Sequence, residues 1–354
     1  EIASCLVGSE MCIRDREEEM KKILAVLLVA VFAFALSACG GDKESEETVY
    51  TLRFAHGSST SEPIHIAAEY MAEELEERSD GRIKVEIYPS ATLADQVPAC
   101  EMLMDGTLDF FGGSVVAVEN YIDEFKIVDL PYLVSDYESA DALFEGEVGQ
   151  ELSDMLPDIG LENLGWCEYG FRNTFNNIRP IESADDFKGI KIRAIESPIS
   201  VGMWTAFGTD PTVMGWSDVY SGLQMGTVEG ADGPNALFAS AQMETVCKYM
   251  STTQHMYTPG VILASKATMD KLPEDLQALV REVGAEAAEK MKEITRETQE
   301  DAADQMEENG LIINEVTAKV REELADMCKG VYEENRDIIG AEFYDKVMKQ
   351  LGRS

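Results

Sequence analysis

The segment FKGIKIRA, residues 187–194, shows the local pattern from which we predict the fold of the chain. Gly189 predicts a turn, and residues 190–195 alternate between apolar and polar side chains, as in a short β-strand with one buried face. The isoleucines lie on one face, and Lys191 and Arg193 lie on the other. Arg193 is therefore either the polar side of a half-buried strand or a residue that holds a ligand.

A helix is predicted directly after this strand. Ser197 before Pro198 is typical of a helix N-terminus, and Gly208 is typical of a helix end. A strand at 211–214 and a helix at 217–226 repeat the order. An earlier series has the same alternation, with strands at 51–55, 83–88 and 108–112 and helices at 62–78 and 96–105. Such alternation predicts parallel sheets covered by helices, an α/β fold.

The size of the chain and one long apolar stripe predict two lobes. The chain from Cys39 onward exceeds the size, about 250 to 300 residues, at which one hydrophobic core stops growing. Between Pro273 and Asn309, apolar residues recur at helical spacing. One helix over this range is about 55 Å long, at about 1.5 Å per residue. It is longer than one lobe, so we expect it to run along both.

The N-terminal segment predicts export and a lipid anchor. Residues 1–19 are interpreted as a gene-model artefact, and residues 20–38 as a lipoprotein signal peptide with a basic start and a short apolar run. The sequence LSAC before Gly40 resembles a lipobox, in which Cys39 becomes the lipidated first residue of the mature chain. Residues 39–48 then form a polar tether. We therefore expect an extracytoplasmic protein that is anchored to the membrane.

Composition and motifs exclude several functions. The formal net charge is −38, so the chain repels the phosphates of nucleic acid. The three histidines, His56, His65 and His255, have no metal-ligand spacing, and the sequence contains no nucleophile elbow, P-loop or dinucleotide fingerprint. We predict no enzyme activity, no cofactor and no metal. Four cysteines are predicted to be buried apolar residues, with one disulfide left open: Cys100, Cys167, Cys247 and Cys328.

Candidate site residues follow the strands, because open parallel sheets bind ligands beyond the carboxyl ends of their strands. The first series offers hydroxyl and backbone groups in the loops that contain Ser58 and Ser114. The second series offers Arg193 and Trp216. A guanidinium beside a helix N-terminus suits a carboxylate or a phosphate, although a surface ion pair is the alternative for Arg193 in so acidic a chain.

Seven motifs in this order resemble one family. They are YPSATLADQ (88–96), GTLDFFGGS (106–114), DLPYLVSDYE (129–138), GFRNTFN (170–176), FKGIKIRA (187–194), DPTVMGWSDVYSGLQMGTVEGADGP (210–234) and KLPEDLQ (271–277). The chain from about residue 49 to 343 resembles the DctP-like extracytoplasmic solute-binding subunits of tripartite ATP-independent periplasmic (TRAP) transporters.

The resemblance implies a fold and a function. The fold is two-lobed and periplasmic-binding-protein-like (type II-like), with two mostly parallel sheets flanked by helices. Lobe one is expected at 49–170 plus about 259–298, and lobe two at 171–258 plus about 299–345. The lobes close on an organic acid, of the sugar-acid or C4-dicarboxylate type, and the protein delivers it to membrane permease subunits. We expect it to act as a monomer.

The resemblance also assigns roles to residues. It implies that Arg193 anchors the ligand carboxylate, that Arg172 assists it, and that Trp216 closes over the ligand. Asp95 and Ser114 match positions that touch ligand in some members of the family, and Ser58 and Asn235 complete the predicted set.

One motif departs from the family pattern. Many members read V-D-G-x-E-N-P where this chain reads VEGADGPN at 228–235, so that Gly233 stands in place of the usual asparagine. We expect Asn235 or Asp232 to compensate. The departure prevents a transfer of ligand identity from other members.

Three other functions are considered. They are a binding lipoprotein of an ATP-driven (ABC) importer, a ligand-sensing module for a membrane receptor, and a secreted enzyme. The pair of GFRN and KIR segments favours the TRAP family over the first, and the missing catalytic signature disfavours the last. Neighbouring genes for permease subunits or for a sensor kinase distinguish transport from sensing.

Overall fold

The structure, a computed structural model, describes residues 48–353. The predictions for residues 1–47, including lipidation of Cys39, lie outside the described residues. Residues from Val49 onward form one compact unit. Within the described range, every helix is too short or too polar to cross a membrane.

The first predicted series forms one parallel half of a sheet. β1 (Tyr50–His56) lies between β2 (Ile83–Tyr88) and β3 (Phe110–Ser114) and pairs with both in parallel. Two helices, α2 (Pro63–Arg78) and α3 (Gln96–Met104), connect these strands. The predicted alternation is confirmed, although the third strand begins and ends two residues later than expected.

The second predicted series forms the other parallel half. β5 (Lys191–Ala194) lies between β6 (Asp210–Val213) and β7 (Gly230–Gly233) and is parallel to both. The helices between them are α6 (Pro198–Ala206) and α7 (Val219–Met225). Ser197 is the N-cap of α6, as predicted, but its side chain makes no capping hydrogen bond.

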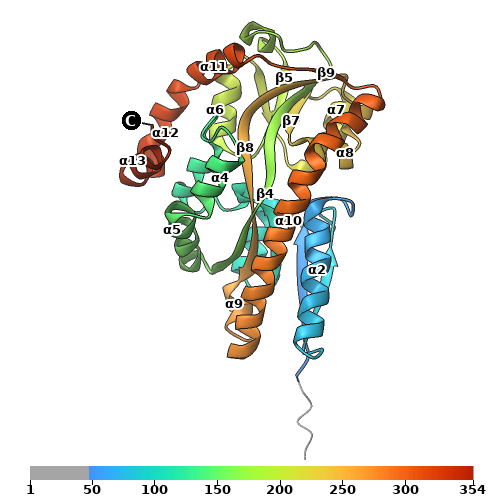
Figure 1. The fold of residues 1–354 in the computed structure, drawn as a ribbon, viewed down its shortest axis with the longest axis vertical. Helices are drawn as coiled ribbons and strands as arrows, with labels where there is room; N and C mark the ends of the chain where they lie inside the picture. The colour runs from blue at the N-terminus through green and yellow to red at the C-terminus, as the bar shows by residue number, and fades with distance from the viewer. Residues whose placement is uncertain (1–47, 354) are drawn as a thin grey trace, which may run out of the picture. The chain divides into compact units, whose positions relative to one another are not determined.

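Two long strands join the halves into one sheet. β4 (Leu161–Asn176) and β8 (Tyr249–Ser265) are antiparallel to each other, and the order β2-β1-β3-β8-β4-β7-β5-β6 passes through both (Figure 1). The short β9 (Ile312–Asn314) pairs with β8. The two predicted parallel strand sets are therefore two halves of one sheet. The prediction separated them because it identified only part of β4 and no strand at β8.

The ladder between β4 and β8 is irregular at three places. Its register shifts between residues 163 and 165, between 168 and 170, and between 172 and 174. Gly170 has a φ of 98°, in the left-handed region that favours glycine. Pro259, which has no N–H to donate, lies opposite Glu168 beside the second shift. These bulges bend the two strands where they pass from one half of the sheet to the other.

The long predicted helix is confirmed as α10 (Glu274–Glu308), which runs beside α2 and β4 toward α8 (Asn235–Ser240) in Figure 1. Its apolar stripe enters two cores. Val280 and Met291 pack with α2 in one cluster, and Met306 packs with Phe175 in another. The helix therefore supports both halves of the sheet.

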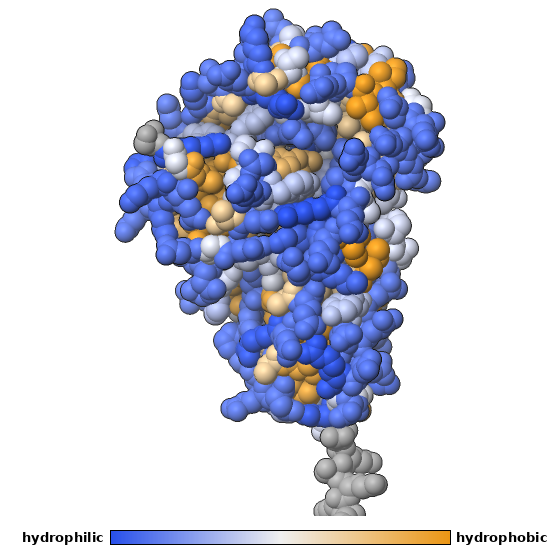
Figure 2. Space-filling view, in the orientation of Figure 1, coloured by the Kyte–Doolittle hydropathy of each residue, from blue (hydrophilic) through white to orange (hydrophobic). Residues whose placement is uncertain are grey.

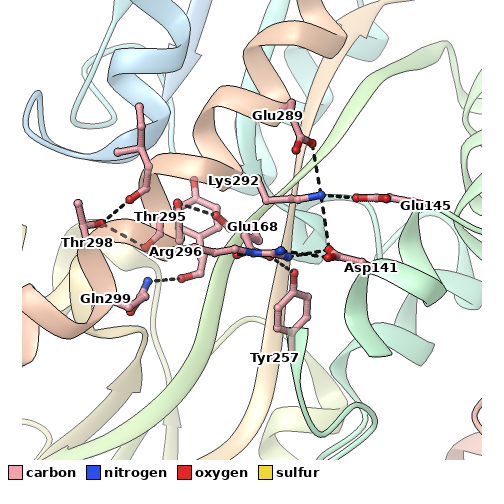
Figure 3. A network of polar contacts seen from close by, with 12 residues as sticks. Asp141, Glu145, Glu168, Tyr257, Glu289, Lys292, Thr295, Arg296, Thr298 and Gln299 are labelled. Carbon is pink, nitrogen blue, oxygen red and sulfur yellow. Dashed lines mark hydrogen bonds and ion pairs between the residues drawn. The ribbon is translucent and has the colours of Figure 1, made fainter. Parts of the chain in front are cut away.

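A polar network holds α10 against the strands (Figure 3). Arg296 of α10 donates to the buried carboxylate of Glu168 on β4 at 2.8 Å, and to Asp141 on α4 (Tyr137–Phe144) at 2.6 and 3.0 Å. The hydroxyl of Tyr257 on β8 also donates to Glu168, at 2.6 Å. Lys292 adds ion pairs with Asp141, Glu145 and Glu289. Because Glu168 has several donors, its charge is compensated despite complete burial.

The C-terminal helices cover the side of the molecule opposite α10 in Figure 1. α11 (Ala318–Met327) packs on the core of the second half, whereas α13 (Ala341–Gln350) packs with α5 (Glu147–Met155). α12 (Lys329–Ile339) lies between them. The other elements are α9 (Lys266–Met269) and the 3-10 segments η1 (Val115–Ala117), η2 (Asp123–Asp129), η3 (Leu156–Ile159), η4 (Ala184–Phe187), η5 (Trp216–Asp218) and η6 (Met243–Thr245).

The four cysteines of this range are buried and free, as predicted, so none of them forms a disulfide with another. Burial raises the thiol pKa of Cys100 and of Cys328 to about 12. Figure 2 shows a mainly hydrophilic face on which apolar residues gather only in separate small groups. No group of three or more histidine, cysteine, aspartate or glutamate side chains within residues 48–353 is arranged to hold a metal ion.

Candidate ligand-binding site

Five of the predicted residues line one cavity of about 50 Å³: Ser58, Ser114, Arg172, Arg193 and Trp216. They come from the strand ends of both halves of the sheet and from β4 between them. Thus residues more than 150 positions apart in sequence share one small space, at the edge where open parallel sheets bind ligands.

Arg193 presents an unpaired guanidinium to this cavity. Its Nε donates to the backbone oxygen of Met214 at 2.9 Å, and its two terminal nitrogens make no hydrogen bond to any residue from 48 to 353. Burial, together with the charge of Arg172, lowers its pKa to about 10, so it remains charged at neutral pH. A planar cation with a free two-nitrogen edge suits a carboxylate.

Arg172 is already paired. Its Nε donates to Asp232 Oδ2 at 2.5 Å, a second nitrogen donates to the backbone oxygen of Asp232 at 2.7 Å, and the third donates to the Thr258 hydroxyl at 3.2 Å. His255 Nε2 lies 3.1 Å from the same carboxylate oxygen. Burial raises the pKa of Asp232, but Arg172 and His255 outweigh that effect and hold it well below its usual range. Asp232 therefore compensates the charge of Arg172.

A pair of acidic groups lies at the cavity. Asp129, at the end of η2, lines it, and the buried Glu119 interacts with Asp129. Both oxygens of Glu119 and Oδ2 of Asp129 have no hydrogen-bond partner among the described residues. Burial raises the pKa of both carboxyls, and the Asp129 charge raises that of Glu119 further. The two carboxyl groups therefore disfavour each other's ionisation.

Glu196 is the second acid in the lining. It follows β5 and is partly exposed. Burial and the charge of Asp95 raise its pKa, and Arg193 lowers it. The lining therefore contains two carboxyl groups, those of Asp129 and Glu196.

Trp216 and Ser114 have defined supports. The Trp216 ring contacts Phe238, with 5.8 Å between ring centroids. Gln96 Oε1 accepts from the hydroxyl of Ser114 at 2.7 Å and from its backbone N–H at 3.1 Å. Gln96 itself lines the cavity, so it both contributes to the wall and orients Ser114.

Two predicted site residues lie outside the lining. Asp95 is the N-cap of α3, and its Oδ2 accepts from the hydroxyl and the backbone N–H of Ser217 at 2.9 and 3.3 Å. It thereby joins the first half of the sheet to η5 of the second. Asn235 accepts from the side-chain amide of Asn173 at 2.9 Å and donates to the backbone oxygen of Gln299 on α10 at 3.3 Å.

The departure at Gly233 has a steric explanation. A Cβ built there lies 2.2 Å from the ring of Phe238, which occupies the space where a side chain would be. Neither expected substitute faces the cavity: Asp232 pairs with Arg172, and Asn235 bonds to Asn173 and α10. Phe238 in turn contacts Trp216, so the absence of a side chain at Gly233 makes room for the ring that supports Trp216.

Sequence reasoning missed several lining residues, among them Gln96, Asp129, Tyr169, Glu196 and Thr258. Three of them are adjacent to or within recognised motifs. Gln96 ends YPSATLADQ, Asp129 begins DLPYLVSDYE, and Tyr169 precedes GFRNTFN. Their positions in or beside these motifs could have identified them as lining residues. Nothing local marks Thr258, which reaches the cavity only because β8 pairs with β4.

The fold and the site together, one sheet with a cavity at the strand ends of both of its parallel halves, suit the binding of a small solute. The family model for bacterial extracellular solute-binding proteins, family 7 (DctP), matches residues 54–337. The chain belongs to this family, whose members include the solute-binding proteins of TRAP transporters. The family and its curated members are solute-binding proteins rather than enzymes, in agreement with the prediction, and the match favours a TRAP system over an ABC importer.

Relatives with assigned ligands support this membership. The 2,3-diketo-L-gulonate-binding periplasmic protein YiaO of Escherichia coli K12 is 30% identical over 250 residues, which cover 70% of this chain and 76% of YiaO. The sugar acid binding protein DctPAm of Advenella mimigardefordensis, solved with galactonate, has a TM-score of 0.84 and 27% identity over 86% of this chain and 98% of its own. A TRAP periplasmic solute-binding protein of Sulfurospirillum deleyianum, solved with succinate, has a TM-score of 0.81 and 25% identity over 85% and 99% of the two chains.

Proposed function

We propose that this protein captures a sugar acid or a C4-dicarboxylate in the cavity beside Arg193 and delivers it to the membrane subunits of a TRAP transporter. The observation that carries the proposal is the free edge of the Arg193 guanidinium, which is buried and charged. A buried cation without a carboxylate partner is costly, and an anionic ligand compensates it. The relatives bind acids of both types, which supports the ligand class without choosing between them.

Capture proceeds by lobe closure in this proposal. Lobe one comprises residues 49–170 and about 259–298, and lobe two comprises residues 171–258 and about 299–345. The contact between Asp95 and Ser217 joins the two and supports this division. A lipid on Cys39 holds the monomer at the membrane, where the permease subunits lie.

A thermal-shift screen tests the proposal. The chain from residue 39, carrying Cys39→Ser, is heated with dicarboxylates, aldonates, uronates and 2-oxo acids. A ligand at 100 times its dissociation constant stabilises the protein by about 2.7 kcal/mol, which raises Tm by a few degrees. We expect at least one acid to do so. If folded protein free of co-purified ligand responds to none of them, the proposal is wrong.

A further inference from the structure

The two arginines of the cavity differ in their partners, and this difference limits how many carboxylates a ligand needs. Two guanidinium groups line it, but they are not equivalent. Arg172 shares a buried ion pair with Asp232, whereas Arg193 bonds only to the backbone oxygen of Met214. Among the described lining residues, Arg193 is thus the one cation without an ion pair, and its free edge can bind a ligand carboxylate. One carboxylate is enough for this purpose.

The remaining lining groups favour hydrogen-bond donors. Asp129 and Glu196 offer carboxyl oxygens, and Oδ2 of Asp129 has no partner in the described chain. Ligand hydroxyls donate to such oxygens and satisfy them, whereas a second ligand carboxylate has no proton to donate. The hydroxyls of Ser58, Ser114 and Thr258 can accept from or donate to the same ligand hydroxyls.

A second carboxylate finds no unpaired cation among the described lining residues. Glu119 interacts with Asp129, and Asp95 lies near Glu196, so each acid of the lining has another acid beside it. A buried anion without a partner is strongly disfavoured, and such groups are a means of rejecting the wrong ligand.

We infer that the cavity selects hydroxylated monocarboxylates and rejects dicarboxylates of the same length. This inference rests on the proposed function and narrows it to the sugar-acid type. Arg193 binds the single carboxylate, the ligand hydroxyls donate to Asp129 and Glu196, and Trp216 covers the carbon chain.

Matched ligands separate charge from hydroxylation. Galactonate and galactarate differ only at the last carbon, which is a hydroxymethyl group in the first and a carboxylate in the second. D-Erythronate and meso-tartrate differ in the same way in a chain of four carbons. Butyrate and succinate lack the hydroxyls. Titration calorimetry measures the six dissociation constants at one pH and one ionic strength.

We expect each hydroxylated monocarboxylate to bind about 10-fold or more tightly than its dicarboxylate, since one uncompensated charge contact outweighs a factor of ten in affinity. Butyrate is expected to bind more weakly than D-erythronate. Glu196→Gln removes one negative charge from the lining and should reduce the preference for galactonate over galactarate about threefold or more. Glu322→Gln, an exposed change on α11, serves as the matched control and should leave the ratio unchanged.

The outcomes distinguish the two proposals. If the dicarboxylates bind as tightly as their partners, or more tightly, the inference is overturned while organic-acid capture stands. If Glu196→Gln leaves the ratio at its original value, the lining acids do not set the selectivity and the inference is likewise overturned. If no organic acid binds at all, the proposed function fails.

Discussion

Replacement of Arg193 by alanine tests the site most directly. The side chain is buried, its Nε is held by Met214, and its free edge is the only described cationic group of the lining without a carboxylate partner. Breaking a buried ion pair by removing one member costs about 3–5 kcal/mol. At about 1.4 kcal/mol for each factor of ten, the dissociation constant should rise about 100- to 5,000-fold.

Two further variants separate charge, geometry and folding. Arg193→Lys keeps the charge but loses the planar two-nitrogen edge, so we expect affinity between that of the wild type and that of Arg193→Ala. Arg179→Ala removes an exposed arginine of the same half and should leave affinity unchanged. Titration calorimetry with the acid identified by the thermal screen provides the constants.

The ligand-free protein provides the fold control. In that state the Arg193 charge is buried without a carboxylate partner, so its removal should leave Tm unchanged or raise it. An Arg193→Ala protein that is folded and binds the acid within threefold of the wild-type affinity would refute the anchor role. If Arg193→Ala loses both binding and the folded state, the affinity of the Arg193→Lys variant tests the anchor role in its place.

Three other predictions concern stability and closure. Burial raises the Glu119 pKa above its unfolded value, so ionisation destabilises the fold as pH rises. Glu119→Gln should therefore raise the free energy of unfolding in urea at pH 7–8, by about 1.4 kcal/mol for each pKa unit of that shift, and the gain should vanish near pH 4. A gain independent of pH would contradict this. Arg296→Met leaves Glu168 buried with fewer donors and should cost about 3–5 kcal/mol in urea unfolding, part of which Glu168→Gln restores in the double variant. Ser217→Ala removes a hydroxyl bond to Asp95 and should weaken ligand affinity by about 0.5–1.5 kcal/mol in calorimetry; an unchanged constant would show that the contact does not stabilise the bound state.

The sequence predicts those parts of the fold that local signals determine. Caps such as Ser197 and helix ends such as Gly226 mark the strand–helix alternation, and both halves of the sheet were found in this way. β8 was not found, because its residues mix polar and apolar types, contain Pro259, and become a strand only by pairing with segments about 70 to 150 positions away.

The site residues likewise fall into those that sequence motifs predict and those that only the tertiary structure reveals. Arg172, Arg193 and Trp216 stand in motifs and were predicted, whereas the importance of Glu119 was not visible. The chain contains 67 aspartate and glutamate residues, and composition does not reveal which of them the fold buries. Only the tertiary structure shows that the buried Glu119 interacts with Asp129. It also shows that Arg172 forms its ion pair with Asp232, which leaves Arg193 as the arginine with a free edge.

The bulged pair of β4 and β8 has a mechanical consequence. Both strands are continuous between the halves of the sheet. Relative motion of the halves therefore has to bend two hydrogen-bonded strands, because no flexible linker separates the halves here. The softest points of this strand pair are the three register shifts, and Arg172 stands at one of them. Relative motion of the two halves would therefore change the backbone hydrogen bonds of the peptide units beside Arg172, which lines the site.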